Sequence, residues 1–188
     1  MFTQQPSITV SGADVDSVEE GDGGEIEVTW EKFEFSEILV GSLESPEAVV
    51  FIHYDSFEGG SVDNGAAVAV ALERLKELDL KKTLLAFTAP DEPSHEEPYW
   101  GFGFRFFEKE FKDVLESADV IVTFDSVGLS SPLALRDKKS LEDLLPLEDK
   151  GLLEKAVGVT SDWDKLFEIY HSDLDTPDKV DYSKTVEA

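Results

Sequence analysis

Cysteine is absent from this 188-residue chain, which excludes disulfide bonds and leaves nitrogen and oxygen as the ligands for any metal ion. Basic residues are scarce: 16 lysines and arginines stand against 42 aspartates and glutamates, for a formal net charge of −26. Because nucleic-acid binding depends on basic side chains that neutralise phosphates, nucleic acid is not an expected partner. The same charge argues against an anionic membrane as a partner.

Long apolar runs are also missing. No stretch approaches the ~20 apolar residues of a membrane span, and the N-terminal sequence MFTQQPSITV lacks the features of a signal peptide. With 41% hydrophobic residues, the chain can bury one sizeable core, so we expect a single compact domain over residues 1–188. We expect it to be soluble and cytoplasmic. Residues 1–35 could instead be the tail of a preceding, inserted domain.

Patterns of buried strands alternate with helical patterns along the chain. The strand over residues 47–54 is apolar nearly throughout, which is typical of a strand covered on both faces. The alternation predicts a three-layer α/β/α fold with a mixed, largely parallel central sheet. The predicted strands are 25–35, 36–43, 47–54, 81–90, 118–126 and 165–171, and the predicted helices are 63–80, 100–117, pieces of 141–156 and a terminal helix after 175.

Histidine and acidic residues follow these strands at their carboxyl ends, where open α/β sheets bind ligands. The chain has three histidines, and two of them come at the end of a predicted strand. Asp63 is added by the turn that opens the first helix, where backbone amides favour a carboxylate. The residues placed at the strand ends are His53, Asp55, Asp91, Glu92, Asp125 and His171.

Spacing suggests roles for two pairs of these residues. His53 and Asp55 are two apart on a strand, so both side chains leave on the same face and the carboxylate could orient the imidazole for a metal. Asp91 and Glu92 are adjacent and therefore point differently. One of them could bind a metal while the other accepts a proton from water that the metal activates.

Five motifs, in this order, carry a family resemblance. The chain resembles the two-zinc aminopeptidases of the bacterial leucyl aminopeptidase type, metallopeptidase family 28, whose relatives include glutamate carboxypeptidase and the zinc-dependent glutaminyl cyclases. The resemblance runs from about Ser36 to Val186. The motifs are HYDS, GSVDNGAAVAVALERLKEL, LLAFTAPDE, VIVTFDSVG and YHSDLDTPDKVD.

The resemblance implies the zinc-exopeptidase fold and a site with two zinc ions per chain. His53 and Asp125 would bind one zinc, Glu92 and His171 would bind the other, and Asp63 would bridge them. Asp55 would support His53 as the second catalytic carboxylate. Asp91 falls where the family has its general base.

The general base is the main departure from the family, which has a Glu-Glu pair where this chain has Asp91 and Glu92. An aspartate withdraws the carboxylate by about 1.5 Å, a shift that can cost on the order of a hundredfold in rate. A second register, in which Glu96 is the base and Glu97 the ligand, is also open. We prefer Asp91 and Glu92 because they directly follow a strand.

The function that these residues imply is that of a zinc-dependent exopeptidase, foremost an aminopeptidase that hydrolyses N-terminal peptide bonds with a water bridging the metals. Its expected partners are a peptide or a small amide substrate, and a homo-oligomer is possible. The Asp-Glu pair and the shortened segment between Leu129 and Tyr170 motivate one alternative, a non-catalytic metal-binding or scaffolding member of the fold. A second alternative keeps the metal and changes the chemistry, to that of a glutaminyl cyclase or an amide deacylase.

Overall fold

The computed structural model describes residues 34–92 and 97–185. The chain divides into two units, Met1–Glu34 and Phe35–Ala188, and the fold below is that of the second. The strand predicted over 25–35 lies outside the described residues except for Glu34 and Phe35, which are not in a strand. The assignment of residues 1–188 to a single domain stays a prediction.

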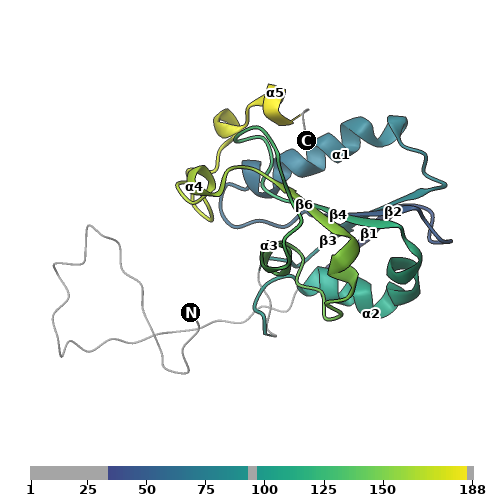
Figure 1. Cartoon of the computed structure of the whole chain (residues 1–188). Helices are drawn as coiled ribbons and strands as arrows, with labels where there is room; N and C mark the ends of the chain where they lie inside the picture. Colours follow the sequence, from purple (N-terminus) through teal and green to yellow (C-terminus); the bar gives the residue numbers. More distant parts are fainter. Residues whose placement is uncertain (1–33, 93–96, 186–188) are drawn as a thin grey trace, which may run out of the picture. The chain divides into compact units, whose positions relative to one another are not determined.

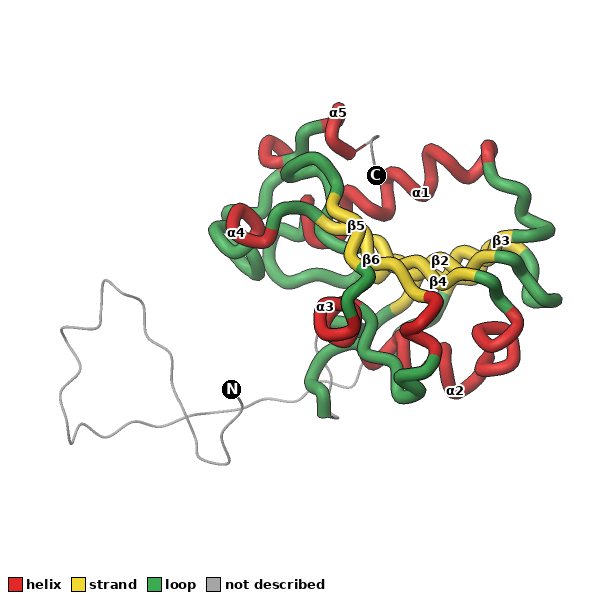
Figure 2. Tube along the Cα trace, viewed as in Figure 1, coloured by secondary structure: helices red, strands yellow, loops and turns green. Residues whose placement is uncertain are grey.

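A six-stranded sheet forms the centre of the fold, with the order β1-β3-β2-β4-β6-β5 (Figures 1 and 2). The inner strands run parallel to one another, whereas β1 and β5 pair antiparallel at the two edges. The predicted mixed, largely parallel sheet is confirmed. The strands are β1 Ile38–Gly41, β2 Ala48–His53, β3 Thr83–Thr88, β4 Val120–Phe124, β5 Leu133–Leu135 and β6 Ala156–Thr160.

Helices cover both faces of the sheet, α1 on one side and α2 with α3 on the other (Figure 1). The predicted three-layer α/β/α fold is thereby confirmed. Within the described residues, no helix has the length and apolar character needed to cross a membrane. The helices are α1 Ala67–Arg74, α2 Phe102–Ser117, α3 Lys138–Leu144, α4 Trp163–Leu166 and α5 Tyr182–Thr185, with short helical turns η2 Ser61–Ala66, η3 Leu75–Glu77, η4 Leu152–Lys155 and η5 Pro177–Lys179.

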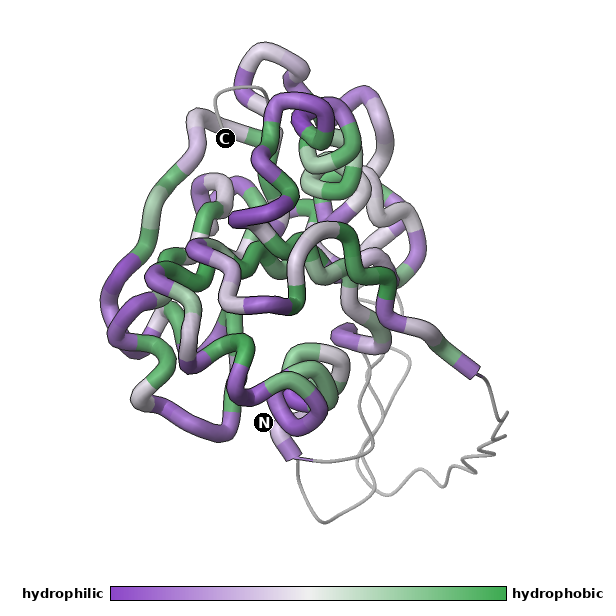
Figure 3. The backbone as a smooth tube through the Cα atoms, turned by 90° about the vertical axis from the view of Figure 1, so that its right-hand side faces the viewer, coloured by the Kyte–Doolittle hydropathy of each residue, from purple (hydrophilic) through white to green (hydrophobic). Residues whose placement is uncertain are grey.

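Strand β2 shows why the inner strands are apolar on both faces. Phe51 points to the α2 side, where its ring meets those of Phe104 and Phe107 edge-to-face at centroid distances of 5.5 and 5.0 Å. Ile52 points to the other side and packs in a cluster with Ala67 of α1. In Figure 3, hydrophobic stretches gather toward the middle of the chain trace. Burial on both faces holds the strand ends in fixed positions.

The strand predicted over residues 165–171 is wrong. Helix α4 and hydrogen-bonded turns occupy this segment, and the amide of Tyr170 donates to the carbonyl of Leu166 at 2.8 Å. Leu166 and Ile169 are the buried apolar residues, and their spacing of three is helical rather than alternating. The last strand of the sheet is β6, which lies in the segment where the sequence pattern was weakest.

Glu37, just before β1, has buried carboxyl oxygens that no hydrogen bond stabilises. Neither Oε1 nor Oε2 has a hydrogen-bond partner, and burial, with the nearby charges of Asp91 and Glu110, raises the pKa of Glu37 to about 8. The ordinary pKa is 4.5, so the folded protein binds more protons than the unfolded chain between these values. Stability should therefore fall as the pH rises through this window.

We expect Glu37→Gln to remove this loss of stability at higher pH. The variant should have a higher Tm than the wild type at about pH 9 and the same Tm at about pH 4, where Glu37 is protonated in both states. Scanning calorimetry of the metal-free proteins measures the difference. Equal Tm values at the higher pH would contradict the uncompensated burial of Glu37.

Candidate metal centre

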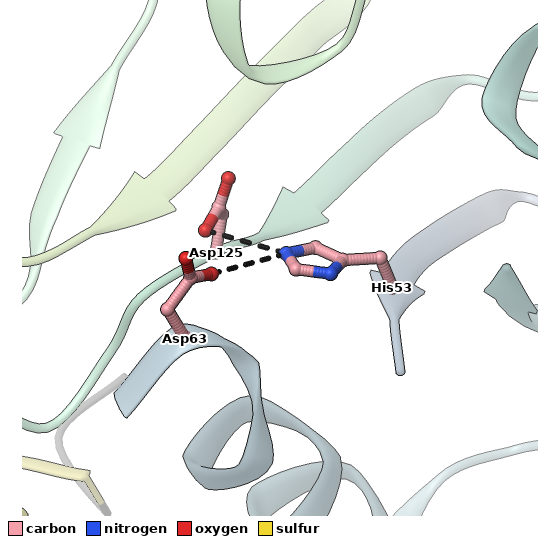
Figure 4. A group of neighbouring side chains, drawn as sticks. All are labelled: His53, Asp63 and Asp125. Atoms are coloured by element: carbon pink, nitrogen blue, oxygen red, sulfur yellow. Dashed lines mark ion pairs between the residues drawn. The ribbon is translucent and has the colours of Figure 1, made fainter. Parts of the chain in front are cut away.

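Three parallel strands end at one edge of the sheet and bring the predicted residues together. His53 is the last residue of β2, Asp91 and Glu92 follow β3, and Asp125 follows β4. Figure 4 shows the side chains of Asp63 and Asp125 converging on the imidazole of His53 from separate elements. His171 reaches the same place from the turns after α4, not from a strand as predicted.

Asp63 lies in the turn η2, directly before α1. Its φ of −113° and ψ of 87° are non-helical, and the following peptide bond to Asn64 is cis. The side chain of Asp63 points toward His53 and lies beside Asp125 (Figure 4). The residue is only 3% exposed. The buried carboxylate therefore sits at the centre of the group.

Two clusters of potential ligands share Asp63. In the first, His53 Nε2 lies 3.3 Å from Asp63 Oδ1 and 3.6 Å from Asp125 Oδ1. In the second, His171 Nε2 lies 2.6 Å from Glu92 Oε2 and 3.6 Å from Asp63 Oδ2. In each cluster the ligand atoms lie within 4.8 Å of one another. One imidazole and two carboxylates form each cluster, a donor set that suits zinc.

The electrostatics of these clusters favour a bound cation. Asp63 Oδ2 is buried and has no hydrogen-bond partner. Burial, followed by the charge of Asp63, raises the pKa of Glu92 to about 9. Burial lowers the pKa of His53, but the neighbouring carboxylates of Asp125, Asp55 and Asp63 more than offset this and raise it well above its ordinary value. Crowded carboxylates that hold protons would release them to a divalent metal.

Asp55 supports both sides of the site, though by a different route from the one predicted. His53 Nδ1 lies 3.1 Å from the backbone carbonyl of Asp55 and 3.7 Å from its carboxylate, so the carbonyl is the closer orienting group. The Asp55 carboxylate Oδ2 accepts hydrogen bonds from the amides of Asp91 and Glu92, both at 2.9 Å. Asp55 thus fixes the backbone that carries the predicted base and ligand.

Asp91 is buried against the start of α2. Its Oδ2 accepts a hydrogen bond from the Thr88 hydroxyl, and its Oδ1 accepts one from the amide of Phe104 at 3.1 Å. A Cβ on Gly103 would lie 3.0 Å from Asp91 Oδ2, so glycine allows the helix to approach. Burial raises the pKa of Asp91 to about 6 although both hydrogen bonds favour the carboxylate.

The alternative register is only partly described. Glu97 is exposed and belongs to neither ligand cluster, whereas Glu96 lies outside the described residues. Asp91 and Glu92 both line the cavity at the strand ends. The geometry thus brings together the members of the preferred register.

An aromatic cavity adjoins the two clusters. Its lining includes the aromatic side chains of Trp100, Phe104, Trp163, Phe167 and Tyr170. The ring of Tyr170 stacks on His171 with a centroid distance of 3.6 Å. A molecule held in this cavity would lie directly against the candidate ligands.

Solved structures share this architecture, whereas no protein-family model and no curated protein matches the sequence. The LapA aminopeptidase of Legionella pneumophila aligns with a TM-score of 0.59 at 13% identity, over 81% of this chain and 54% of that one. A glutaminyl cyclase from an Acidobacteriales bacterium aligns with a TM-score of 0.58 at 14% identity, over 79% and 67%. A Zn-dependent exopeptidase from Parabacteroides distasonis aligns with a TM-score of 0.58 at 15% identity, over 80% and 73%.

The chain has the zinc-exopeptidase fold. The predicted resemblance to the bacterial zinc aminopeptidases and glutaminyl cyclases is confirmed at the level of structure. The chain spans about half the length of LapA aminopeptidase.

Two residues that hold the candidate site in this zinc-exopeptidase fold were missed by sequence reasoning. Asp175, buried in the DTPDK segment, accepts hydrogen bonds from the amides of Val62 at 2.7 Å and Asp63 at 3.0 Å. Asn64 donates to the carbonyls of His53 and Phe124 and accepts from the amide of Ser126. In the sequence, Asn64 lies in the SVDNG segment and Asp175 in the DTPDK segment, both of which are also ordinary turn sequences.

We expect Asp175→Ala to loosen the Asp63 turn. Loss of two buried, charge-assisted hydrogen bonds should lower the free energy of unfolding by about 3 kcal/mol and the zinc affinity by roughly 10- to 100-fold. Chemical denaturation and competition with a zinc chelator measure the two effects. Asp178→Ala is the matched control, because Asp178 is an exposed acid of the same segment that bonds Thr176. Equal behaviour of the two variants would contradict the positioning role of Asp175.

Proposed function

We propose that the protein is a zinc-dependent exopeptidase that acts as an aminopeptidase on peptides or small amides. The observation that supports this proposal is the sharing of Asp63 by two nitrogen and oxygen ligand clusters, directly beside a cavity. In the proposed site, His53 and Asp125 hold one zinc ion, Glu92 and His171 hold a second, and Asp63 serves both. Bound zinc would polarise the scissile carbonyl and lower the pKa of the attacking water.

Asp91 is the proposed general base. It lines the cavity next to Glu92, and its pKa of about 6 keeps it ionised at neutral pH while leaving it basic enough to take a proton. Asp91 would receive the proton of the attacking water and pass it to the amine that leaves. Thr88 and the amide of Phe104 hold its carboxylate in one orientation during both transfers.

The charge of the cavity favours an aminopeptidase over a carboxypeptidase. Outside the proposed zinc ligands, the carboxylates of Asp91 and Asp143 line the cavity, and no lysine or arginine among the described residues does so. A free N-terminal amine fits these acidic groups, whereas a C-terminal carboxylate finds no lysine or arginine to pair with there. The bond attacked is therefore placed next to the substrate's N-terminus.

A second candidate is a metal-binding member of the fold without catalysis. Both carboxylate oxygens of Asp91 already accept hydrogen bonds within the protein, which favours a structural role for this residue at the start of α2. A third candidate, glutaminyl cyclisation or amide deacylation, is supported by the glutaminyl cyclases among the structural neighbours.

One assay separates the three candidates. The zinc-loaded protein is incubated with a library of short peptides, some of which begin with glutamine and some of which carry a blocked N-terminus, with and without chelator. Release of N-terminal residues that stops with chelator supports the aminopeptidase. Formation of pyroglutamate alone, removal of acyl groups alone, or no reaction at all would each contradict it.

We also propose a cytoplasmic location, with no nucleic-acid or membrane partner, and leave a homo-oligomer as a possible assembly. The net charge of −26 supports the absence of anionic partners. Sedimentation of the purified protein measures the oligomeric state.

A further inference from the structure

The side-chain pocket beside the candidate metal centre has a composition of its own. It is part of the cavity of about 200 Å³ that the candidate ligands also line. Trp163, Phe167 and Tyr170 follow one another at helical spacing and contact in series, with ring centroids 5.7 and 6.0 Å apart. Phe167 is 61% exposed, so core side chains do not cover its ring. The three rings present a continuous aromatic surface to the cavity.

Trp100 also lines the cavity, and two hydrogen-bonded contacts hold it in place. Its indole Nε1 donates to the backbone carbonyl of Asp143 at 3.1 Å. Behind it, the buried Arg105 donates to the Trp100 carbonyl at 2.6 Å and to the Pro98 carbonyl at 3.1 Å. Asp143 and Leu144, at the end of α3, also line the cavity. Trp100 is therefore positioned before any ligand binds.

Asp143 supplies the charge that distinguishes this pocket. Zinc ions would neutralise the carboxylates that bind them, so Asp143 is the acidic group of the lining outside the metal centre and its base. No salt bridge joins Asp143 to a lysine or arginine of the part of the chain that the structure describes. Thr160, fully buried in the same lining, has a hydroxyl without a hydrogen-bond partner. The pocket thus offers acceptors and aromatic faces but no cation.

From this composition we infer that the pocket binds a positively charged side chain of the lysine or arginine type in the N-terminal residue of the substrate, an inference that rests on the proposed function. The aliphatic stem would lie against Leu144 and Leu166, and the cationic head would lie among the aromatic faces and the Asp143 carboxylate. An acidic side chain would meet only like charge. Aromatic faces and a carboxylate together bind a cation more tightly than a neutral chain of equal length.

Binding of free amino acids to the zinc-loaded protein tests the inference without requiring turnover. L-lysine and L-norleucine have side chains of nearly equal length and differ in the terminal ammonium, and L-glutamate carries the opposite charge. By calorimetry we expect lysine to bind roughly tenfold more tightly than norleucine, with glutamate weaker than both. Hydrolysis of the matching aminoacyl nitroanilides should follow the same order in kcat/KM.

Two variants test whether Asp143 causes the preference for lysine over norleucine. Asp143→Asn should lower lysine affinity roughly five- to tenfold and leave norleucine affinity unchanged. Glu142→Gln, which neutralises the neighbouring half-buried acid of α3 that pairs with Lys138, should change neither. Zinc content and Tm show that both variants are folded.

The outcomes for the pocket and for the proposed function are distinguishable. Equal binding of lysine and norleucine, tighter binding of glutamate, or an unchanged lysine preference in Asp143→Asn would overturn the inference, even if every substrate is hydrolysed. A lysine preference that depends on Asp143 in a protein that hydrolyses nothing would support the pocket and refute the aminopeptidase.

Discussion

Asp63→Ala is expected to abolish the binding of both zinc ions at micromolar metal and to lower peptidase activity by at least about a thousandfold. Asp63 offers Oδ1 to the cluster of His53 and Oδ2 to that of His171, so one substitution removes a ligand from each. Zinc content measured by mass spectrometry after dialysis, together with kcat/KM, gives the two effects.

Measuring the stability of the metal-free protein tests whether this loss of zinc binding and activity is caused by unfolding. Asp63 is buried beside Glu92 and Asp125, and its charge helps to raise the pKa of Glu92. Removing it relieves repulsion, so the metal-free variant should have a Tm equal to or above that of the metal-free wild type. Asp173→Ala, which removes an exposed acid near His171, is the matched control and should keep both zinc ions. An Asp63→Ala protein that retains two zinc ions would refute the shared-ligand site.

Asp91→Asn should lower kcat by roughly 10²- to 10⁴-fold while the protein keeps its zinc. Asparagine preserves the size of the side chain and can still accept a hydrogen bond from the Phe104 amide, but it cannot take a proton. Because the pKa of Asp91 is about 6, wild-type kcat should fall as the pH drops through that value, and the residual activity of the variant should lack this decline. Steady-state kinetics over pH measure both effects.

Two results would contradict the role of Asp91. If kcat is unchanged in Asp91→Asn, the base is another residue, with Glu96 as the first alternative. If the wild type is inactive and Asp91→Glu is active, the natural chain has lost its base. In that case the two hydrogen bonds to Asp91 serve the packing of α2 alone.

The sequence predicted the inner part of the fold because those strands are buried on both faces. The apolar run that becomes β2 needs no partner information to be read as a central strand. The error over residues 165–171 has the opposite cause: its apolar residues fit both a short strand and a helical turn, and tertiary packing of Leu166 and Ile169 decides between them. The short edge strand β5 gave little signal, because only three residues pair with β6.

His53, Glu92 and Asp125 were predictable as candidate ligands because they follow buried strands, and Asp63 because it precedes α1. His171 was predicted at the end of a strand, whereas the structure has it in the turns after α4. The role of Asp175 could not be predicted from the local sequence. Its carboxylate accepts a hydrogen bond from the amide of Asp63, which lies 112 residues earlier in the chain. Contacts of this kind depend on the folded backbone, and only the structure reveals them.

Two zinc ions that share Asp63 are the centre of the proposed site, and anomalous scattering from zinc-soaked crystals tests this arrangement most directly. We predict two peaks at the zinc edge in each chain, one among His53, Asp63 and Asp125 and the other among Asp63, Glu92 and His171. Peaks elsewhere, a single peak, or no peak at a zinc concentration that saturates the protein in solution would contradict it.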